Sequence, residues 1–219
     1  MKTFSAIAIS SALVFSLAAC APSDNSSDPA LIAPSPSASS STSSLEPAEA
    51  SPEEIAKAAE EISEQIQTNT PTMSNVAGVA WEALMSADGE YAAAASYQAV
   101  IDKFGAVEPY TTIFEAELRH ISALIRQLER EGVAVPDNPY IGQLPAPESL
   151  QIAAEAWATG EIKNVEMYDQ LLAKTTDSNL IRVLSNLRRS SLESHLPLFT
   201  AAAENGGTLT PEQMTATHG

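Results

Sequence analysis

The stretch Phe114-Glu115-Ala116-Glu117-Leu118-Arg119-His120 places a glutamate and a histidine three residues apart in a segment with helical periodicity. Residues at i and i+3 lie on one face of an α-helix, so the Glu117 carboxylate and the His120 imidazole can reach a common point. The stripe around them recurs every three or four residues and consists of Ile113, Glu117, His120, Leu124 and Leu128. Both polar side chains are therefore in line with core positions, where buried polar groups need partners. The pattern predicts half of a carboxylate-bridged metal site.

Four long helices are predicted between residues 75 and 204, with no second domain. Their ranges are about 75–104, 109–131, 148–174 and 179–204. A few residues around Gly105 join the first two helices, which makes that pair antiparallel. The segment 132–147 contains four prolines and two glycines. It can span about 45 to 50 Å, whereas a helix of about 22 residues is only about 33 Å long. We therefore expect a long crossover, with the second and third helices parallel.

Each predicted helix carries a titratable residue on its inward stripe. These residues are Glu90 in the first helix, Glu117 and His120 in the second, Glu161 in the third and His195 in the fourth. Glu161 is preferred in the third helix because it shares a stripe with Trp157 and Val165, and Glu166 is the alternate.

With these residues in view, the chain resembles the ferritin-like superfamily, and within it an uncharacterised bacterial group called domain of unknown function 2202. The similarity covers about residues 84–205 and is carried more by spacing than by identity. It rests on Glu90, Ala93 and Tyr97, on the Phe104-Gly105 turn, on Ile113, Glu117 and His120, on Gly132 and Pro136, and on Ser191 to Leu196 with Phe199.

The chain departs from the full ferritin pattern in its third and fourth helices. That pattern has a second Glu-x-x-His in the fourth helix, but the residue three before His195 is Leu192, and Glu193 points elsewhere on a regular helix. The third helix carries Lys163-Asn164 where the group tends to carry adjacent acids. One metal position could therefore be weak or missing.

The resemblance implies an all-α fold with a ferritin-like four-helix bundle over residues 71–205. It also implies a di-iron or di-manganese centre with oxidase, peroxide or metal-handling chemistry, which would make an enzyme of this kind a di-metal oxidoreductase. Carboxylate and imidazole ligands suit divalent iron or manganese, and carboxylates can bridge two ions about 3.5 to 4 Å apart. The implied ligands are Glu90, Glu117, His120, Glu161 or Glu166, and His195.

An alternative keeps the bundle but not the metal. In that case the glutamates and histidines satisfy one another in a degenerate core, and the protein has a binding or structural role in the cell envelope. Tyr97 and Tyr168 lie on neighbouring stripes. We interpret them as amphipathic core tyrosines with hydroxyls at the edge, in preference to donors at the centre or electron relays.

The N-terminus predicts export and a lipid anchor. Residues 3–19 are almost entirely apolar or small, and a polar stretch follows at once, as in a cleaved signal peptide over residues 1–20. The closing Leu17-Ala18-Ala19-Cys20 resembles the bacterial lipobox, in which the cysteine is lipidated. Cys20 is the single cysteine, which excludes an intrachain disulfide. We expect an extracytoplasmic lipoprotein, in the outer membrane if the cell is Gram-negative, because Ala21 is not aspartate.

The segments on either side of the bundle are predicted from composition. Residues 21–50 are rich in Ser, Pro and Ala and predict a disordered tether. Residues 51–70 predict one short amphipathic helix, opened by the capping signal Ser51-Pro52-Glu53-Glu54, that docks on the bundle surface. Residues 206–219, including His218, predict a flexible tail.

The formal net charge of −17 argues against a nucleic-acid partner. Residues 71–219 remain acidic, with 19 acids against nine bases. Arg119, Arg126 and Arg130 fall on the outer face of the second helix, where we expect weak surface ion pairs. The expected partner is a membrane, through the anchor at Cys20, and the prediction also allows a homodimer.

Overall fold

The computed structural model describes residues 49–70 and 72–217. The predicted signal peptide, the lipobox at Cys20 and the predicted tether up to residue 48 lie outside the described residues. Among the described residues, no helix is long and apolar enough to cross a membrane.

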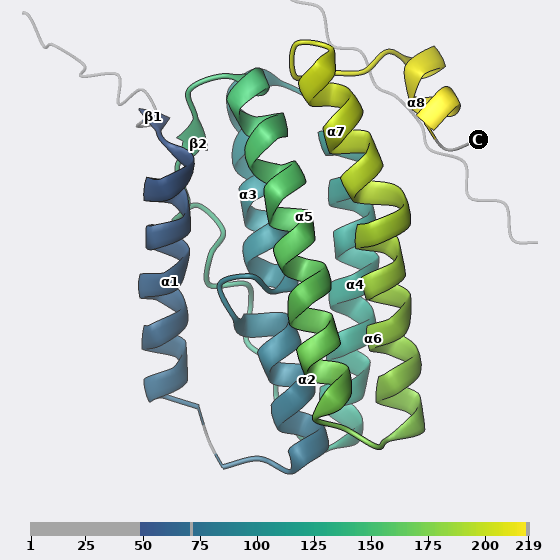
Figure 1. Cartoon of the computed structure of the whole chain (residues 1–219). Coiled ribbons are helices and arrows are strands. Elements are labelled where there is room, and N and C mark those ends of the chain that lie inside the picture. The colour runs from purple at the N-terminus through teal and green to yellow at the C-terminus, as the bar shows by residue number, and fades with distance from the viewer. Residues whose placement is uncertain (1–48, 71, 218–219) are drawn as a thin grey trace, which may run out of the picture. The chain divides into compact units, whose positions relative to one another are not determined.

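The described residues confirm an all-α fold class (Figure 1). The one exception is a parallel pair of two-residue strands, β1 (Glu49–Ala50) and β2 (Ala146–Pro147). The helices are α1 (Pro52–Thr68), α2 (Asn75–Met85), α3 (Glu90–Phe104), α4 (Tyr110–Arg130), α5 (Leu150–Ala173), α6 (Ser178–Ser190), the π-helix η1 (Ser191–His195), α7 (Leu196–Glu204) and α8 (Pro211–Thr217).

Helix α1 begins at a capping box. The Ser51 side chain accepts from the Glu54 backbone N–H, and the Glu54 carboxylate accepts from the Ser51 backbone. This reciprocal pair satisfies amide groups that a helix start leaves free. The helix buries Ile55 and Ala59 and lies along the outside of the other helices (Figure 1).

The first predicted long helix is broken in the structure. Helices α2 and α3 are separated by a tight turn over residues 86–89, in which the Gly89 N–H donates to the Ser86 carbonyl at 2.9 Å. A Cβ at Gly89 would lie 2.8 Å from the Ala83 carbonyl oxygen, so the turn has room only for glycine. As a consequence Glu90 is the first residue of α3, with Gly89 as its N-cap.

Helices α4 and α5 begin at the same end of the molecule. The Tyr110 hydroxyl, in the first turn of α4, donates to the Leu150 carbonyl, in the first turn of α5, at 2.9 Å. The segment 131–149 therefore runs from the end of α4 back along the molecule to the start of α5, a distance that its length allows (Figure 1). Two tyrosines hold it in place: Tyr91 donates to the Pro136 carbonyl, and Tyr140 donates to the Met85 carbonyl.

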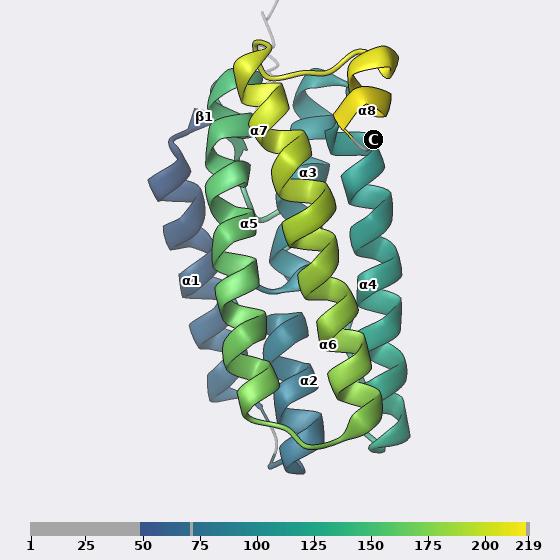
Figure 2. The same cartoon turned by 45° about the vertical axis from the view of Figure 1, so that its right-hand side comes forward.

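Helices α6, η1 and α7 form one continuous rod that returns antiparallel to α5 (Figure 2). The π-turn comes directly before Pro197. A proline has no N–H and crowds the carbonyl four residues earlier, which disfavours a regular α-helical turn there. The backbone instead forms a wider turn, in which the Leu196 N–H donates to the Ser191 carbonyl.

The C-terminal segment differs from the flexible tail expected over residues 206–219. The Leu209 N–H donates to the Glu108 carbonyl at 2.9 Å, its side chain is buried, and α8 follows. Just before Leu209, the backbone at Gly207 passes close to the start of α5. A Cβ at residue 207 would lie 2.2 Å from the Leu150 backbone, so only glycine fits there. The predicted tail is therefore wrong up to Thr217, and His218 lies outside the described residues.

The core consists of two apolar clusters with a polar layer between them. One cluster includes Ile121, Tyr168 and Leu187, and the other includes Ile113, Trp157 and Leu198. Buried polar residues fall between the two sets in sequence: Glu117 on α4, Glu161 and Asn164 on α5, and Ser191 and His195 on the α6–α7 rod. This layer holds the candidate site.

Candidate metal centre

Five of the six predicted ligands converge in the polar layer. They come from four elements: Glu90 from α3, Glu117 and His120 from α4, Glu161 from α5 and His195 from η1. Glu90, Glu117, Glu161 and His195 are each at most 2% exposed, and the His120 side chain is 15% exposed.

Glu166 is not part of the site. Its side chain is exposed on α5, whereas Glu161 is buried. Five residues of α-helix correspond to a rotation of about 140° beyond a full turn, so only one of these two glutamates can face inward. The alternate assignment to Glu166 is therefore wrong.

The ligand atoms form two triads that share Glu117. In the first triad, His120 Nδ1 lies 2.8 Å from Glu117 Oε2 and 3.4 Å from Glu90 Oε2. In the second, His195 Nδ1 lies 3.1 Å from Glu117 Oε1 and 3.4 Å from Glu161 Oε1. Glu117 therefore presents one oxygen to each histidine, which is the arrangement of a bridging carboxylate.

Several of these atoms are buried without a hydrogen bond. They are Glu90 Oε2, Glu117 Oε1, Glu161 Oε2 and His195 Nδ1. The contact between His195 Nδ1 and Glu117 Oε1 is short, but it does not have hydrogen-bond geometry. An unsatisfied buried polar atom costs about 1–3 kcal/mol. Lone pairs that converge in this way without satisfying one another fit a pair of divalent cations, and the donor set of carboxylates and imidazoles fits iron or manganese.

Outer hydrogen bonds hold three of the ligands. The Tyr168 hydroxyl donates to Glu90 Oε1, and the Tyr97 hydroxyl donates to Glu161 Oε1 at 2.7 Å. Both tyrosines are buried, so the expectation of hydroxyls at the edge is wrong. Burial also raises the pKa of both hydroxyls well above the usual range, which keeps them protonated as donors.

Ser190 is a site residue that the sequence pattern did not predict. Its Oγ lies 3.1 Å from His195 Nε2, the ring nitrogen that points away from the carboxylates. A serine five residues before a histidine is out of line on an α-helix, but the π-turn brings the two together. Pro197 is the sequence signal that could have indicated this turn.

The metal-free cluster is internally compensated near neutral pH. Burial, together with the charge of Glu117, raises the pKa of Glu90 to about 8. Although burial acts to lower it, the hydrogen bond to Glu117 and the nearby Glu90 carboxyl raise the pKa of His120 to about 10. Burial acts against His195 too, but the charge of Glu117 raises its pKa to about 10.

Glu117 is the anionic member of this cluster. Burial acts to raise its pKa, but the neighbouring Glu90 carboxyl and the charge of His195 hold that pKa well below the usual range. Protons on the histidines therefore occupy ligand positions, and a bound cation has to displace them.

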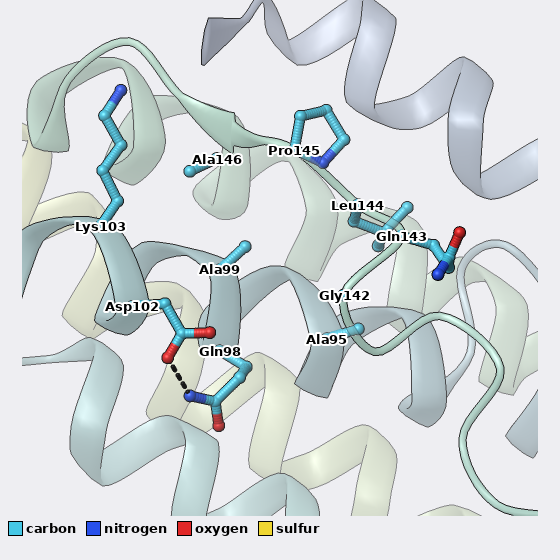
Figure 3. A pocket seen from close by; sticks show the side chains of 10 residues that line it. All are labelled: Ala95, Gln98, Ala99, Asp102, Lys103, Gly142, Gln143, Leu144, Pro145 and Ala146. Atoms are coloured by element: carbon cyan, nitrogen blue, oxygen red, sulfur yellow. Dashed lines mark hydrogen bonds between the residues drawn. The ribbon is translucent and has the colours of Figure 1, made fainter. Parts of the chain in front are cut away.

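The surface cavities are separate from this cluster. One, of about 340 Å³, lies between α3 and the crossover, and Gln98 and Asp102 on its wall bond to each other at 2.7 Å (Figure 3). A second, of about 470 Å³, lies beside α1 and Trp81. Neither is lined by a residue of the two triads.

No family model matches the chain, and no curated protein sequence matches it. Among solved structures, the chain is similar to the crystal structure of a hypothetical protein from Methanococcus jannaschii. The TM-score is 0.48 at 20% sequence identity, over 80% of this chain and 97% of that chain. A likeness at this level is too distant to bear on function.

Proposed function

We propose that the protein is a ferritin-like four-helix bundle that binds two divalent ions, iron or manganese, between its helices. The four rods of this bundle are α2–α3, α4, α5 and α6–α7. The observation that carries the proposal is the position of Glu117, whose two carboxylate oxygens face two different histidines, each with a second buried carboxylate beside it.

In this proposal one ion is held by Glu90, Glu117 and His120, and the other by Glu117, Glu161 and His195. Two divalent ions would offset the repulsion among three carboxylates gathered in a low-dielectric layer. Such a pair of ions supplies redox chemistry toward dioxygen or peroxide, or storage and transfer of the metal itself.

The surrounding residues orient the ligands. Tyr97 and Tyr168 fix two carboxylates, and Ser190 fixes the His195 ring with Nδ1 toward Glu117. Outer partners of this kind set ligand orientation and basicity. The second triad has no carboxylate from the α6–α7 rod, because Leu192 and Glu193 are exposed on the far side of η1. Each position nevertheless has the same protein donor set, two carboxylates and one imidazole.

The proposed location rests on the sequence alone. The lipobox ending at Cys20 supports an extracytoplasmic lipoprotein, anchored in the outer membrane if the cell is Gram-negative. An apolar signal followed by a lipidated cysteine anchors a protein without a spanning helix.

The alternative is a bundle without metal that serves binding or structure. The hydrogen bond of 2.8 Å between Glu117 and His120 favours it, because a protonated histidine already compensates that carboxylate. The two functions differ in whether the cluster binds divalent cations that are added to the protein.

Metal content tests the proposal. We expect wild-type protein, reconstituted anaerobically with Fe(II) or Mn(II) and desalted, to retain two ions per chain. Glu117→Gln should retain none, because both positions lose a ligand, whereas the exposed control Glu166→Gln should behave as wild type. Wild-type protein that retains no metal, or a Glu117→Gln variant that retains two ions, would overturn the proposal.

A further inference from the structure

The arginines of this acidic protein are confined to two helices. All six lie in α4 or α6: Arg119, Arg126, Arg130, Arg182, Arg188 and Arg189. Helix α6 carries three of them and has no aspartate or glutamate between Ser178 and Ser190. For a chain with a formal net charge of −17, this is a strongly uneven distribution.

Five of these arginines point outward in two stripes. Arg119, Arg126 and Arg130 are spaced by seven and four residues, which places them on one face of α4, and all three are exposed. Arg182 and Arg189 are seven residues apart on α6 and are also exposed. Figure 2 shows α4 and α6 side by side, so the stripes occupy neighbouring ridges.

The two stripes are level with each other along the helix axes. The rings of His120 and His195 stack with centroids 5.6 Å apart, which fixes the register of α4 against the α6–α7 rod. At about 1.5 Å per residue, Arg126 and Arg189 both lie about 9 Å from that level. Arg130 lies about 15 Å and Arg182 about 20 Å from it, in the same direction. We call the surface formed by Arg119, Arg126, Arg130, Arg182 and Arg189 the arginine face.

The guanidinium groups of the arginine face are not used in ion pairs within residues 49–70 and 72–217. There, the one arginine that bonds a carboxylate is Arg188, with Asp169 at 2.6 Å. Arg182 and Arg189 instead bond the side chains of Asn179 and Asn186. The ion pairs expected for α4 do not form, although Glu115 and Glu129 on this helix and Glu131 directly after it are exposed. The Glu131 carboxylate accepts from Ser74.

We propose that the arginine face docks on an anionic phospholipid bilayer. Guanidinium groups match phosphate in geometry and bind it through paired N–H donors. A bilayer presents phosphates as an extended plane, which suits five arginines spread over two adjacent ridges.

The length of the chain before the described residues is consistent with this partner. Only 28 residues separate Cys20 from Glu49, so the tether reaches at most about 95 Å. If Cys20 is anchored as proposed, the domain stays close to a membrane, and the arginine face determines which side turns toward it. The docking itself does not depend on the metal centre.

Vesicle binding tests whether the arginine face docks on a bilayer, independently of the lipid anchor and of the metal centre. The protein is the chain from residue 20 onward carrying Cys20→Ser, which keeps every described residue. It is sedimented with vesicles of phosphatidylcholine alone, or with a third of that lipid replaced by phosphatidylglycerol. We expect binding to the anionic vesicles only, and a steep loss of binding as salt rises from about 0.05 to about 0.5 M.

Two double variants identify the surface. Arg126→Gln with Arg189→Gln should weaken partitioning about 30-fold, which corresponds to about 1 kcal/mol for each basic group near an anionic surface. Lys57→Gln with Lys174→Gln removes the same charge from other surfaces and should have little effect. Equal loss in both variants, or binding that the arginine variant retains, would overturn the proposal. Capture on immobilised polyglutamate without binding to vesicles would overturn it in favour of an acidic protein partner.

Discussion

Tyr97 and Tyr168 matter because each hydroxyl fixes a different carboxylate of the proposed centre. Tyr97→Phe or Tyr168→Phe removes one outer hydrogen bond and little volume. We expect each to weaken metal binding by about 10–100-fold while the fold is retained. Equilibrium titration of Fe(II) or Mn(II) under anaerobic conditions measures this change.

Tyr140→Phe is the matched control for both substitutions. Tyr140 is equally buried, but it donates to the Met85 carbonyl away from the two triads. We expect it to cost about 1 kcal/mol of stability with no change in metal affinity. Equal affinity losses in all three variants would show that the tyrosines act through general stability.

The raised pKa values predict how the stability of the metal-free protein depends on pH. The pKa of His120 and His195 rises from about 6.5 to about 10, and that of Glu90 to about 8. In each case the folded state holds a proton that the unfolded state releases at lower pH. The stability that these three groups contribute is therefore fully present at pH values below their pKa in the unfolded state. It is lost as the pH rises through their pKa in the folded state. The free energy of unfolding should fall between about pH 7 and pH 10.

The lowered pKa of Glu117 has the opposite sign. Its contribution is present above the ordinary glutamate pKa and is lost only when acid protonates it. Urea unfolding at a series of pH values, with a chelator present, measures how the free energy of unfolding changes with pH. A free energy of unfolding that increases from about pH 7 to pH 10 would contradict the proton assignment.

At the scale of elements, the helices were predictable and their interruptions were not. Periodicity predicted helical segments over about 75–104, 109–131, 148–174 and 179–204, and most of each is helical, because amphipathic stripes repeat at every turn and give a strong signal. The break at Gly89 depends on close backbone contacts in the folded protein, and the π-turn depends on the single proline Pro197. Neither feature disturbs the apolar stripe enough for the sequence pattern to indicate it. The docked tail was missed because Leu209 and Met214, which pack on the core, are isolated apolar residues in a polar segment without helical periodicity.

The break between α2 and α3 predicts an unusual cost for a small substitution. Gly89→Ala puts a Cβ 2.8 Å from the Ala83 carbonyl oxygen, and backbone atoms surround it. We expect a loss of about 1–3 kcal/mol in the free energy of unfolding, with weaker metal binding because Glu90 moves. Thermal unfolding together with metal titration measures both effects.

Gly160→Ala provides the comparison for this substitution. Gly160 lies inside α5, and a Cβ there meets nothing within 4 Å. The same chemical change should raise stability by up to about 1 kcal/mol, through helix propensity alone. A Gly89→Ala protein as stable as Gly160→Ala would show that the turn is not constrained.

At the scale of the whole molecule, the sequence predicted the five residues that converge in the candidate site, but not Ser190 beside them. Glu90, Glu117, His120, Glu161 and His195 were found because each interrupts an apolar stripe with a group that must be paired. Glu161 was preferred over Glu166 because it shares a stripe with Trp157 and Val165, and the structure buries Glu161 and exposes Glu166. Ser190 was missed because its contact with His195 depends on the π-turn, which only Pro197 indicates in the sequence.

The predicted anchor is tested in cells. Cys20→Ser removes the one thiol that could carry a lipid, so the protein should move from the membrane fraction to the soluble fraction. Immunoblotting of fractions after a high-salt wash measures this, since the wash also releases any contact made by the arginine face. Unchanged membrane association after the wash would contradict the lipoprotein assignment.

In the proposed centre, Glu117 joins two cation positions in a buried layer. Cations that bind only the folded state should stabilise it by about 2.7 kcal/mol at a hundredfold excess over Kd. This corresponds to a rise of about 5–10 °C in Tm for a domain of this size. Anaerobic thermal unfolding with and without Fe(II) or Mn(II) is the most direct test. We predict this rise for the wild type and none for Glu117→Gln, whereas a wild-type Tm that does not change up to millimolar metal would contradict the account.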